Sequence, residues 1–307
     1  MKITVIGSGA MGCMFGGKLQ QLPDVRVTLV DAWPDHVSRL CSEGLHMTTD
    51  QGEQVIPVSA CFPQDVSETA DLAIVFTKSM HTASALADAK AAIGPDTTVL
   101  TLQNGLGNIE KIGQFAPKEN IVAGVTTIPS DLVGPGRIAS HGKGSIKVGA
   151  VVPEGAARAT KTGELLNSAG LETEVCDDIL AHIWEKVAFN SALNSLCAVT
   201  GLPVGGVGKS ETGRELARKV VEEVLSVASK KGLATDFDKT WGMVSMALDK
   251  HRDHKPSMLQ DILAKRETEI GTIAGGVAAQ AKALGVKTPT TALLADLVRV
   301  IQNDYLA

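Results

Sequence analysis

The sequence predicts an α/β protein with a doubly wound parallel sheet in its first part and an all-helical second part. Two patterns lead to this prediction. Short apolar runs that are typical of buried strands alternate with helical segments up to about residue 178. From residue 179 the strand signals stop, and only a helical spacing of Leu, Val, Ile and Ala continues. We therefore expect two domains, at residues 1–178 and 179–307.

The first part is expected to open with two strand–helix pairs and a hairpin. Strand 2–6 leads into a glycine-rich turn and a helix over about 10–21, because the apolar residues change there from a continuous run to helical spacing. Strand 26–31 follows, and Pro34 favours the start of the next helix because its fixed φ suits a first turn. Two extended segments flank a turn signal within 47–58, which predicts an antiparallel hairpin.

Three continuous apolar runs complete the predicted parallel core. The runs at 71–77, 98–102 and 121–126 lack polar alternation, as is typical of strands buried on both faces. A further strand, helix and strand are predicted at 145–149, 157–169 and 171–175.

Five helices are predicted in the second part, where Gly and Pro residues mark the breaks between apolar segments. In the fourth helix, Ser257 and Gln260 give a capping-box signal at the start. Three glycines in the same helix lower its propensity but permit close packing. The predicted helices cover 179–200, 211–231, 238–250, 257–284 and 289–304.

Composition and charge exclude several classes of function. The 307 residues carry a formal net charge of −5 without a cluster of Lys and Arg, so we expect no nucleic-acid partner. The five cysteines are scattered, which predicts reduced thiols and no metal site. Apolar stretches stay below membrane-spanning length and no leader precedes the first strand, so we expect a cytoplasmic location without a membrane partner. The helical part offers a surface for a homodimer, although no heptad seam identifies one.

The most informative motif is the turn Gly7-Ser-Gly-Ala-Met-Gly12 between the first strand and the first helix. A strand, a glycine turn and a helix in this order bind the pyrophosphate of a dinucleotide in Rossmann domains. Gly7 permits the tight turn, Gly9 lets backbone N–H groups approach the phosphates, and Gly12 lets the helix pack closely. The residues expected to bind the cofactor are Gly7, Ser8, Gly9, Ala10, Met11 and Gly12.

Asp31 closes the second predicted strand, at about the distance expected for a residue that binds the adenosine ribose. Its carboxylate would accept hydrogen bonds from two ribose hydroxyls and repel a 2′-phosphate. The sequence therefore predicts NAD(H) rather than NADP(H) as the nicotinamide cofactor. A glycine turn in an unrelated α/β fold would need no such residue.

Two polar residues directly follow predicted strands of the first part. Lys78 comes after strand 71–77, and Asn104 comes after strand 98–102. Ligands of doubly wound sheets bind at the carboxyl ends of the strands, so both positions favour a role in binding. Asn104-Gly105 is equally consistent with a plain turn.

The first helix of the second part carries three polar residues at a spacing of four. Lys186, Asn190 and Asn194 fall on one face of an otherwise apolar helix. Burying an ammonium and two amides is costly unless they meet polar partners, and a substrate carboxylate is such a partner. The alternative is a solvated stripe in which the Asn side chains cap neighbouring helices.

Further polar residues of the second part have simpler structural explanations. Helix capping alone would account for Ser257. Glu267 and Glu269 lie near Arg266, and an ion pair on a solvated face is the usual reason for such a group.

Taken together, the motifs of this chain resemble those of the ketopantoate reductase family, in order and over nearly the whole sequence. The helix with Lys-x3-Asn-x3-Asn and the later Ser-Met-x-Gln-Asp with Thr-Glu-Ile are the most specific. The matching segments are Gly7 to Gly12, Thr77-Lys78, Gln103 to Gly107, Gly134 to Arg137, Trp184 to Asn194, Ser257 to Asp261 and Arg266 to Ile270.

The resemblance implies a Rossmann domain, a helical domain and the reduction of 2-dehydropantoate to (R)-pantoate on the route to pantothenate. It implies that Lys186 is the proton donor and that Glu269 serves the active site or the cofactor. Lys78 and Asn104 would contact the nicotinamide nucleotide. By the same resemblance the substrate would be held by Asn190, Asn194 and Ser257.

The chemistry of a hydride transfer suits a lysine at this place. Hydride arriving at a carbonyl carbon builds negative charge on the oxygen, so a nearby ammonium stabilises that charge and then supplies the proton. Desolvation would lower the pKa of Lys186, and Glu269 would oppose that shift if it lies close.

Three departures from the family pattern leave alternatives open. The family often has an Asn shortly before Ser257 and another near Val204, both at substrate contacts, and this chain has neither. After Thr-Glu-Ile the family commonly has Asp and an aromatic residue, where this chain has Gly271-Thr272. Family members generally use NADPH, whereas Asp31 favours NADH. One alternative is therefore a D-2-hydroxyacid dehydrogenase for branched or aromatic 2-oxo acids. A non-catalytic dinucleotide-binding protein is the other, and it would need no acid at Lys186.

Overall fold

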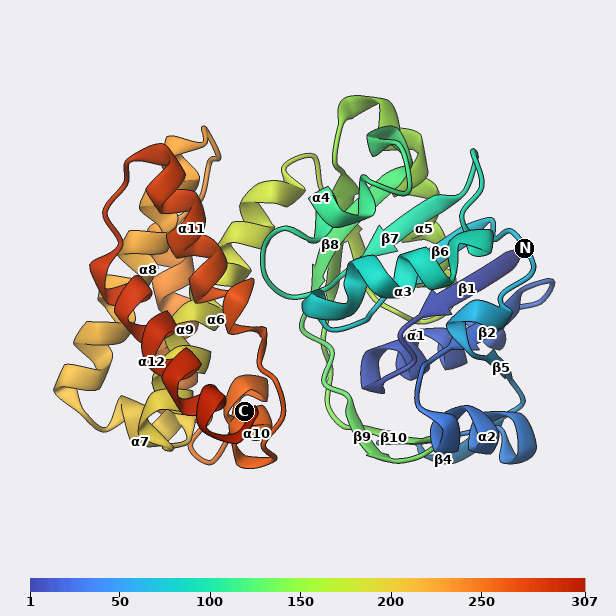
Figure 1. Cartoon of the computed structure of the whole chain (residues 1–307), viewed down its shortest axis with the longest axis horizontal. Coiled ribbons are helices and arrows are strands. Elements are labelled where there is room, and N and C mark those ends of the chain that lie inside the picture. Colours follow the sequence, from blue (N-terminus) through green and yellow to red (C-terminus); the bar gives the residue numbers. More distant parts are fainter. Residues whose placement is uncertain (307) are drawn as a thin grey trace. The chain divides into compact units, whose positions relative to one another are not determined.

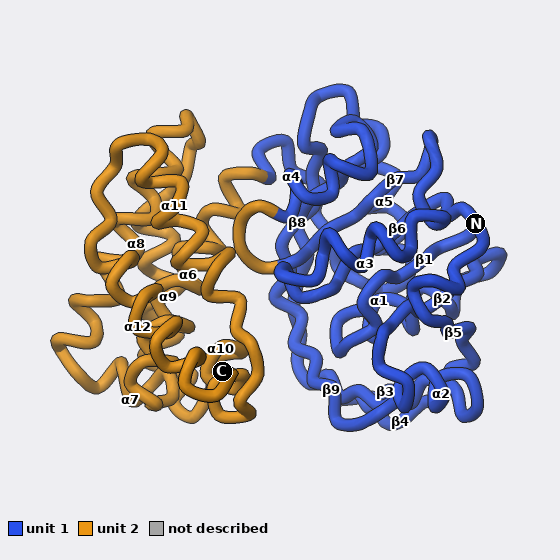
Figure 2. The backbone as a smooth tube through the Cα atoms, in the orientation of Figure 1, with its two compact units in different colours: residues 1–103, 108–179 blue, residues 104–107, 180–307 orange. Residues whose placement is uncertain are grey.

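The computed structural model of the chain describes residues 1–306 and divides into two compact units. The amino-terminal unit comprises Met1–Gln103 and Asn108–Ile179. The helical unit comprises the chain from Leu180 on, together with the short segment Asn104–Gly107 (Figure 2). The sequence did not predict that this segment, which begins three residues after the end of a strand of the first unit, belongs with the helices.

An eight-stranded sheet forms the centre of the amino-terminal unit (Figure 1), in the order β12-β11-β8-β7-β6-β1-β2-β5. The first strand lies in the interior of the sheet and pairs in parallel with β2 on one side and β6 on the other. The strands are β1 (Lys2–Ile6), β2 (Arg26–Val30), β5 (Ser59–Cys61), β6 (Leu72–Val75), β7 (Thr98–Thr101), β8 (Ile121–Thr126), β11 (Ile146–Ala150) and β12 (Thr173–Val175).

The predicted doubly wound sheet is confirmed, with one antiparallel pair. All strand pairs of this sheet are parallel except β8 and β11. Parallel neighbours need a crossover, usually a helix. Between β8 and β11 the chain instead forms strands β9 (Asp131–Gly134) and β10 (Arg137–Ser140), and it returns antiparallel.

Both faces of the sheet are buried, as the continuous apolar runs predicted. In β6, Leu72 and Ile74 pack in one hydrophobic cluster while Ala73 and Val75 pack in another. This alternation follows from the two-residue period of a strand. The helices of the unit are α1 (Ala10–Gln20), α2 (Pro34–Glu43), α3 (Thr82–Asp88), α4 (Asn108–Ile112) and α5 (Ala156–Ser168). Short 3-10 turns lie at η1 (Pro63–Asp65), η2 (Ser79–His81), η3 (Lys90–Ala92), η4 (Lys118–Asn120) and η5 (Pro153–Gly155).

The predicted hairpin belongs to a second, smaller sheet. Strands β3 (Leu45–Thr49) and β4 (Gly52–Ile56) pair antiparallel, as expected. β3 also pairs in parallel with β10, which gives a four-stranded sheet in the order β4-β3-β10-β9. The sequence did not predict β9 or β10, because the pairing that stabilises them joins segments far apart in the chain.

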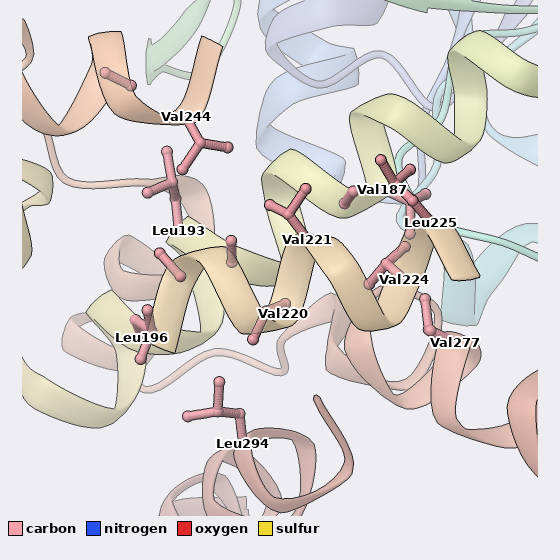
Figure 3. Packing of buried hydrophobic residues seen from close by; sticks show 14 of the residues in the cluster. Val187, Leu193, Leu196, Val220, Val221, Val224, Leu225, Val244, Val277 and Leu294 are labelled. Atoms are coloured by element: carbon pink, nitrogen blue, oxygen red, sulfur yellow. The ribbon is translucent and has the colours of Figure 1, made fainter. Parts of the chain in front are cut away.

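The helical unit is built around α6, whose bounds match the prediction. Buried residues of α6, α8, α9, α11 and α12 form one hydrophobic cluster, in which Leu193, Val220 and Val224 are fully enclosed (Figure 3). The helices are α6 (Ile179–Thr200), α7 (Val204–Gly208), α8 (Glu211–Lys230), α9 (Phe237–Lys250), α10 (Ser257–Leu263), α11 (Ala274–Leu284) and α12 (Pro289–Leu306).

The prediction of one helix over 257–284 is wrong. The chain forms α10, a 3-10 turn η6 (Glu269–Gly271) and α11 instead. Lys265 has a positive φ of 52°, and the Arg266 N–H donates to the Asp261 carbonyl at 2.8 Å. A residue in the left-handed conformation ends a helix because the N–H groups that follow it turn back and donate hydrogen bonds to the last carbonyls of the helix. Gln302 of α12 then accepts a hydrogen bond from the Thr268 hydroxyl at 2.7 Å, which fixes the new chain direction.

Candidate active site

The glycine turn follows β1 directly and is shaped by close backbone contacts. Gly7 has a φ of +92°, and a Cβ there would collide with the backbone of Thr77 at the end of β6. A Cβ at Gly12 would overlap the carbonyl of Gly7. Both positions therefore require glycine for the protein's own packing, as the sequence predicted.

Gly9 differs from these two glycines because the protein itself does not fill the space beside it. A Cβ at Gly9 would meet no atom of residues 1–306 within 4 Å. Gly9 is the N-cap residue of α1, and no acidic side chain lies in the first turn of that helix. The positive end of the helix and the backbone N–H groups of Ala10 and Met11 are thus suited to an anion, and the turn fits the pyrophosphate of a dinucleotide.

Asp31 directly follows β2, and hydrogen bonds to its backbone neighbours fix its carboxylate. One oxygen accepts the Ser8 N–H at 2.9 Å, and the other accepts the Trp33 N–H at 3.0 Å. The residue is half-buried. Because each carboxylate oxygen has two lone pairs, acceptor capacity remains for hydroxyl groups of a ligand.

Ser8 is held from several sides, and His36 is part of this network. The Ser8 hydroxyl donates to the Val30 carbonyl at 3.1 Å, and the Ser8 carbonyl accepts from the Cys13 thiol at 3.0 Å and from His36 Nε2 at 2.8 Å. His36 Nδ1 in turn accepts the Gly136 N–H at 3.0 Å. An acceptor at Nδ1 and a donor at Nε2 define a neutral imidazole. Sequence reasoning missed His36, because its partner at Gly136 is distant in the chain.

Lys78 lies at the carboxyl end of β6, as predicted, and begins the η2 turn as its N-cap residue. The neighbouring strand end is braced by Gln103, whose amide donates to the Thr77 carbonyl at 2.6 Å and to the Thr82 hydroxyl at 2.8 Å. The structure thus joins the carboxyl ends of β6 and β7 on either side of Lys78. The sequence did not identify Gln103 as the brace, although it lies in one of the quoted motifs.

In the helical unit, α6 places Lys186, Asn190 and Asn194 at successive turns. The amide of Asn190 donates to Asn104 Oδ1 at 3.5 Å, and Asn194 is only 5 % exposed. Asn104 is therefore not part of a plain turn; its side chain pairs with a residue of α6. These contacts contradict the alternative of a solvated stripe.

Asn104–Gly107 is also attached to the η6 turn. The Leu106 N–H donates to the Thr272 carbonyl at 2.7 Å, and the Leu106 side chain belongs to the hydrophobic cluster of the helical unit. The Thr272 hydroxyl donates to the Glu269 carbonyl at 3.2 Å. One compact unit therefore holds Asn104, Lys186, Asn190 and Glu269.

Lys186 has the most informative electrostatic surroundings of the predicted site residues. Burial lowers the pKa of Lys186 to about 8, and the nearby Glu269 carboxylate opposes part of that shift. Desolvation disfavours the charged ammonium, whereas an opposite charge favours it. A lysine with this pKa holds its proton at neutral pH yet releases it far more readily than a lysine in water, which suits a general acid.

Two structural expectations for the second part are corrected. Pro256, rather than Ser257, is the N-cap residue of α10, so the predicted capping box is not formed, and Ser257 is exposed. The proline precedes the helix with extended backbone angles and takes the position that Ser257 was expected to occupy. Arg266 pairs with Asp261 at 2.9 Å rather than with the acidic residues that follow it, because the chain reversal at Lys265 brings its guanidinium back onto α10.

Several kinds of site are missing from the part of the chain that the structure describes. Residues 1–306 contain no group of His, Cys, Asp and Glu arranged to hold a metal ion. The five cysteines are free thiols. Within the same residues, every helix is too short or too polar to cross a membrane.

Comparisons with known proteins agree over the whole chain. The family models described as "Ketopantoate reductase PanE/ApbA" and "Ketopantoate reductase PanE/ApbA C terminal" match residues 3–153 and 178–302. The 2-dehydropantoate 2-reductase of Streptococcus pyogenes serotype M1 is 33% identical over 299 residues, which cover 97% of each chain.

Solved structures show the same likeness. A ternary structure of D-mandelate dehydrogenase with NADH and anilino(oxo)acetate has a TM-score of 0.95 at 32% identity, and all of both chains is covered. A PanE/ApbA family ketopantoate reductase from Ralstonia eutropha has a TM-score of 0.91 at 28% identity, also over all of both chains.

The contrast between Gly9 and Gly12 gives a direct test of the dinucleotide site. We expect Gly9→Ala to leave the fold intact and to weaken dinucleotide binding by roughly tenfold, or about 1.4 kcal/mol, because the methyl group occupies space meant for the ligand. Gly12→Ala should instead destabilise the protein by about 1–3 kcal/mol through overpacking. Calorimetric titration and urea unfolding measure the two effects; unchanged affinity in folded Gly9→Ala would argue against the site.

Proposed function

This chain belongs to the ketopantoate reductase family, and we propose that it reduces 2-dehydropantoate to (R)-pantoate with a nicotinamide dinucleotide. It is an oxidoreductase acting on a small 2-oxo acid. The observation that carries the proposal is Lys186, a lysine of the helical unit with a pKa of about 8 beside Glu269. A protein that only binds the dinucleotide would have no use for such an acid.

We propose a division of labour between residues 1–178, which bind the dinucleotide, and residues 179–307, which bind the substrate. The glycine turn holds the pyrophosphate, Asp31 the adenosine ribose, and Lys78 the nicotinamide nucleotide. When bound, the dinucleotide supplies the hydride. Asn104 is assigned to the same nucleotide, although it belongs to the helical unit and pairs there with Asn190.

In the helical unit, Lys186 Nζ hydrogen-bonds the oxo group of the substrate and passes it a proton as negative charge develops on the oxygen. A partly desolvated ammonium stabilises that charge more strongly than one in water, because fewer water dipoles compete. Glu269 keeps the ammonium protonated at neutral pH, since it opposes the fall in the pKa of Lys186. We assign Asn190, Asn194 and Ser257 to holding the substrate, with their N–H and O–H groups as donors to its oxygens.

Replacement of Lys186 tests the role of the acid. We expect Lys186→Ala to lower kcat by roughly 10²–10⁴-fold, the usual contribution of a general acid, while dinucleotide affinity changes little. Lys230→Ala, at the exposed end of α8, is the matched control and should behave as the parent. Parental turnover by Lys186→Ala would remove Lys186 from this role.

The pKa of Lys186 also predicts how the rate depends on pH. Because the acid is active when protonated, kcat for reduction in the parent should fall as the pH rises through about 8.

We further propose that the cofactor is NADH. The support comes from Asp31, whose carboxylate is fixed by two backbone N–H groups after β2 and carries a negative charge there. A 2′-phosphate near that charge would be repelled, whereas ribose hydroxyls would donate to it. The D-mandelate dehydrogenase structure described above contains NADH.

The preference is measured as the ratio of kcat/KM for NADH and NADPH. We expect the parent to favour NADH and Asp31→Asn to shift the ratio toward NADPH by on the order of tenfold, or about 1.4 kcal/mol, because the amide is neutral but still accepts a hydrogen bond. Asp35→Asn, at an exposed position in the first turn of α2, serves as a charge-matched control. A parent enzyme that prefers NADPH would show that Asp31 does not meet the ribose.

A second candidate function is that of a D-2-hydroxyacid dehydrogenase for branched or aromatic 2-oxo acids. The similarity to D-mandelate dehydrogenase, with a TM-score of 0.95 over the whole of both chains, favours it. Both functions use the same acid, the same fold and the same type of reaction, so only the substrate distinguishes them.

A panel of substrates separates the two candidates. We expect kcat/KM to be highest for ketopantoate and lower for 2-oxoisovalerate and phenylglyoxylate under the same conditions. Phenylglyoxylate as the best substrate would instead assign the chain to the aromatic 2-hydroxyacid dehydrogenases. Lys186→Ala measured with the best substrate keeps the test of mechanism independent of this outcome.

A further inference from the structure

Trp33 is a large aromatic residue that the amino-terminal unit leaves at its surface. It follows β2 by three residues, next but one to Asp31, and is 40 % exposed. The other two tryptophans lie in the helical unit, where Trp184 is buried and Trp241 is half-buried. Tryptophan side chains are highly buried on average, and the exposed part of this indole is a flat apolar surface two residues from Asp31 that a ligand can contact.

The Trp33 ring rests on a rigid support. It stacks on the His36 imidazole, with the ring centroids 5.6 Å apart and the planes inclined by only 7°. His36 is 1 % exposed, and both of its nitrogens are engaged, with the Ser8 carbonyl and the Gly136 N–H. The backbone of Trp33 is fixed as well, because its N–H donates to Asp31. An aromatic ring held in this way loses little entropy when a flat ligand stacks on it.

The position of Trp33 identifies which part of a ligand would meet it. Asp31 is the residue assigned to the adenosine ribose, and Trp33 is joined to Asp31 by a hydrogen bond at 3.0 Å. The base attached to that ribose is adenine, which has no charge and offers an extended aromatic face. Indole and adenine stack favourably and do not need a specific hydrogen-bond pattern. A phosphate or a carboxylate would gain nothing from this surface.

We propose that the exposed surface of Trp33 is the platform on which the adenine of the dinucleotide stacks, with His36 as the support beneath the indole. This inference rests on the proposed dinucleotide binding and adds a residue that determines affinity for the adenine half. The same His36 bonds the Ser8 carbonyl of the glycine turn at 2.8 Å. The buried imidazole of His36 therefore supports two features: the glycine turn proposed to bind the pyrophosphate, and the Trp33 ring proposed to stack on the adenine.

ADP-ribose is the probe that tests the platform, because it contains the adenine half of the dinucleotide and lacks nicotinamide. We expect Trp33→Ala to raise the Kd for ADP-ribose by roughly 5- to 100-fold, within the range that loss of base–aromatic stacking produces. Trp33→Phe keeps an aromatic face and should stay within about threefold of the parent. Trp241→Phe, in the helical unit, is the matched control and should bind as the parent. Titration calorimetry measures each Kd without any turnover.

Tryptophan fluorescence gives a second, independent readout. Stacking of adenine on Trp33 should quench part of the parent emission when ADP-ribose is added. That quenching should vanish in Trp33→Phe at saturating ADP-ribose but persist in Trp241→Phe. Circular dichroism confirms that each variant is folded, and because Trp33 is partly exposed we expect no loss of structure.

Each outcome has a defined meaning. Folded Trp33→Ala that binds ADP-ribose within twofold of the parent would overturn the platform, as would full quenching in Trp33→Phe. If the parent itself does not bind ADP-ribose, the proposed dinucleotide binding fails instead, and the platform falls with it. Loss of ADP-ribose affinity in Trp33→Ala together with parental substrate preference would support the platform whichever 2-oxo acid is the substrate.

Discussion

The close approach of three backbone segments at the glycine turn is the constraint on which the amino-terminal unit depends. The end of β1, the start of α1 and the end of β6 come so near one another that Gly7 and Gly12 leave no room for a side chain. This contact sets where α1 begins, and the helix starts at the Gly9 cap without an acidic side chain in its first turn. It also fixes Ser8, whose backbone N–H reaches the carboxylate after β2. The residues proposed to bind the pyrophosphate and the ribose are thus held by one packing arrangement.

The helical unit has a different governing balance, between burial and charge at Lys186. Desolvation alone would drive the ammonium toward its neutral form, and a neutral amine is a poor acid. Glu269 restores part of the preference for the charged form, leaving a pKa of about 8. The η6 turn that carries Glu269 also binds the backbone of Leu106 through Thr272. The residues from Glu269 to Thr272 therefore affect both the pKa of Lys186 and the position of the loop after β7.

The segment Asn104–Gly107 follows β7 in the chain but belongs to the helical unit. Leu106 inserts an apolar side chain into the cluster around α6 and α8, and Asn104 pairs with Asn190. Burial of a leucine side chain is worth about 1.5–3 kcal/mol, more than a plain polar turn would gain in water. A residue assigned to the nucleotide is therefore held by the unit that is assigned to the substrate.

Elements with local signals could be predicted from the order of the amino acids alone. Periodicity and backbone sterics within a few neighbouring residues predict the glycine turn, the apolar strands of the large sheet and the bounds of α6. They also predict that Lys186, Asn190 and Asn194 share one face of that helix. The remaining features could be seen only in the folded chain. Four features depend on partners distant in the chain: the pairing of β10 with β3, the hydrogen bond between Gly136 and His36, the hydrogen bond between Thr268 and Gln302, and the pKa of Lys186 beside Glu269. Such contacts form only when folding brings the partners together, and their energies leave no periodic trace in the sequence.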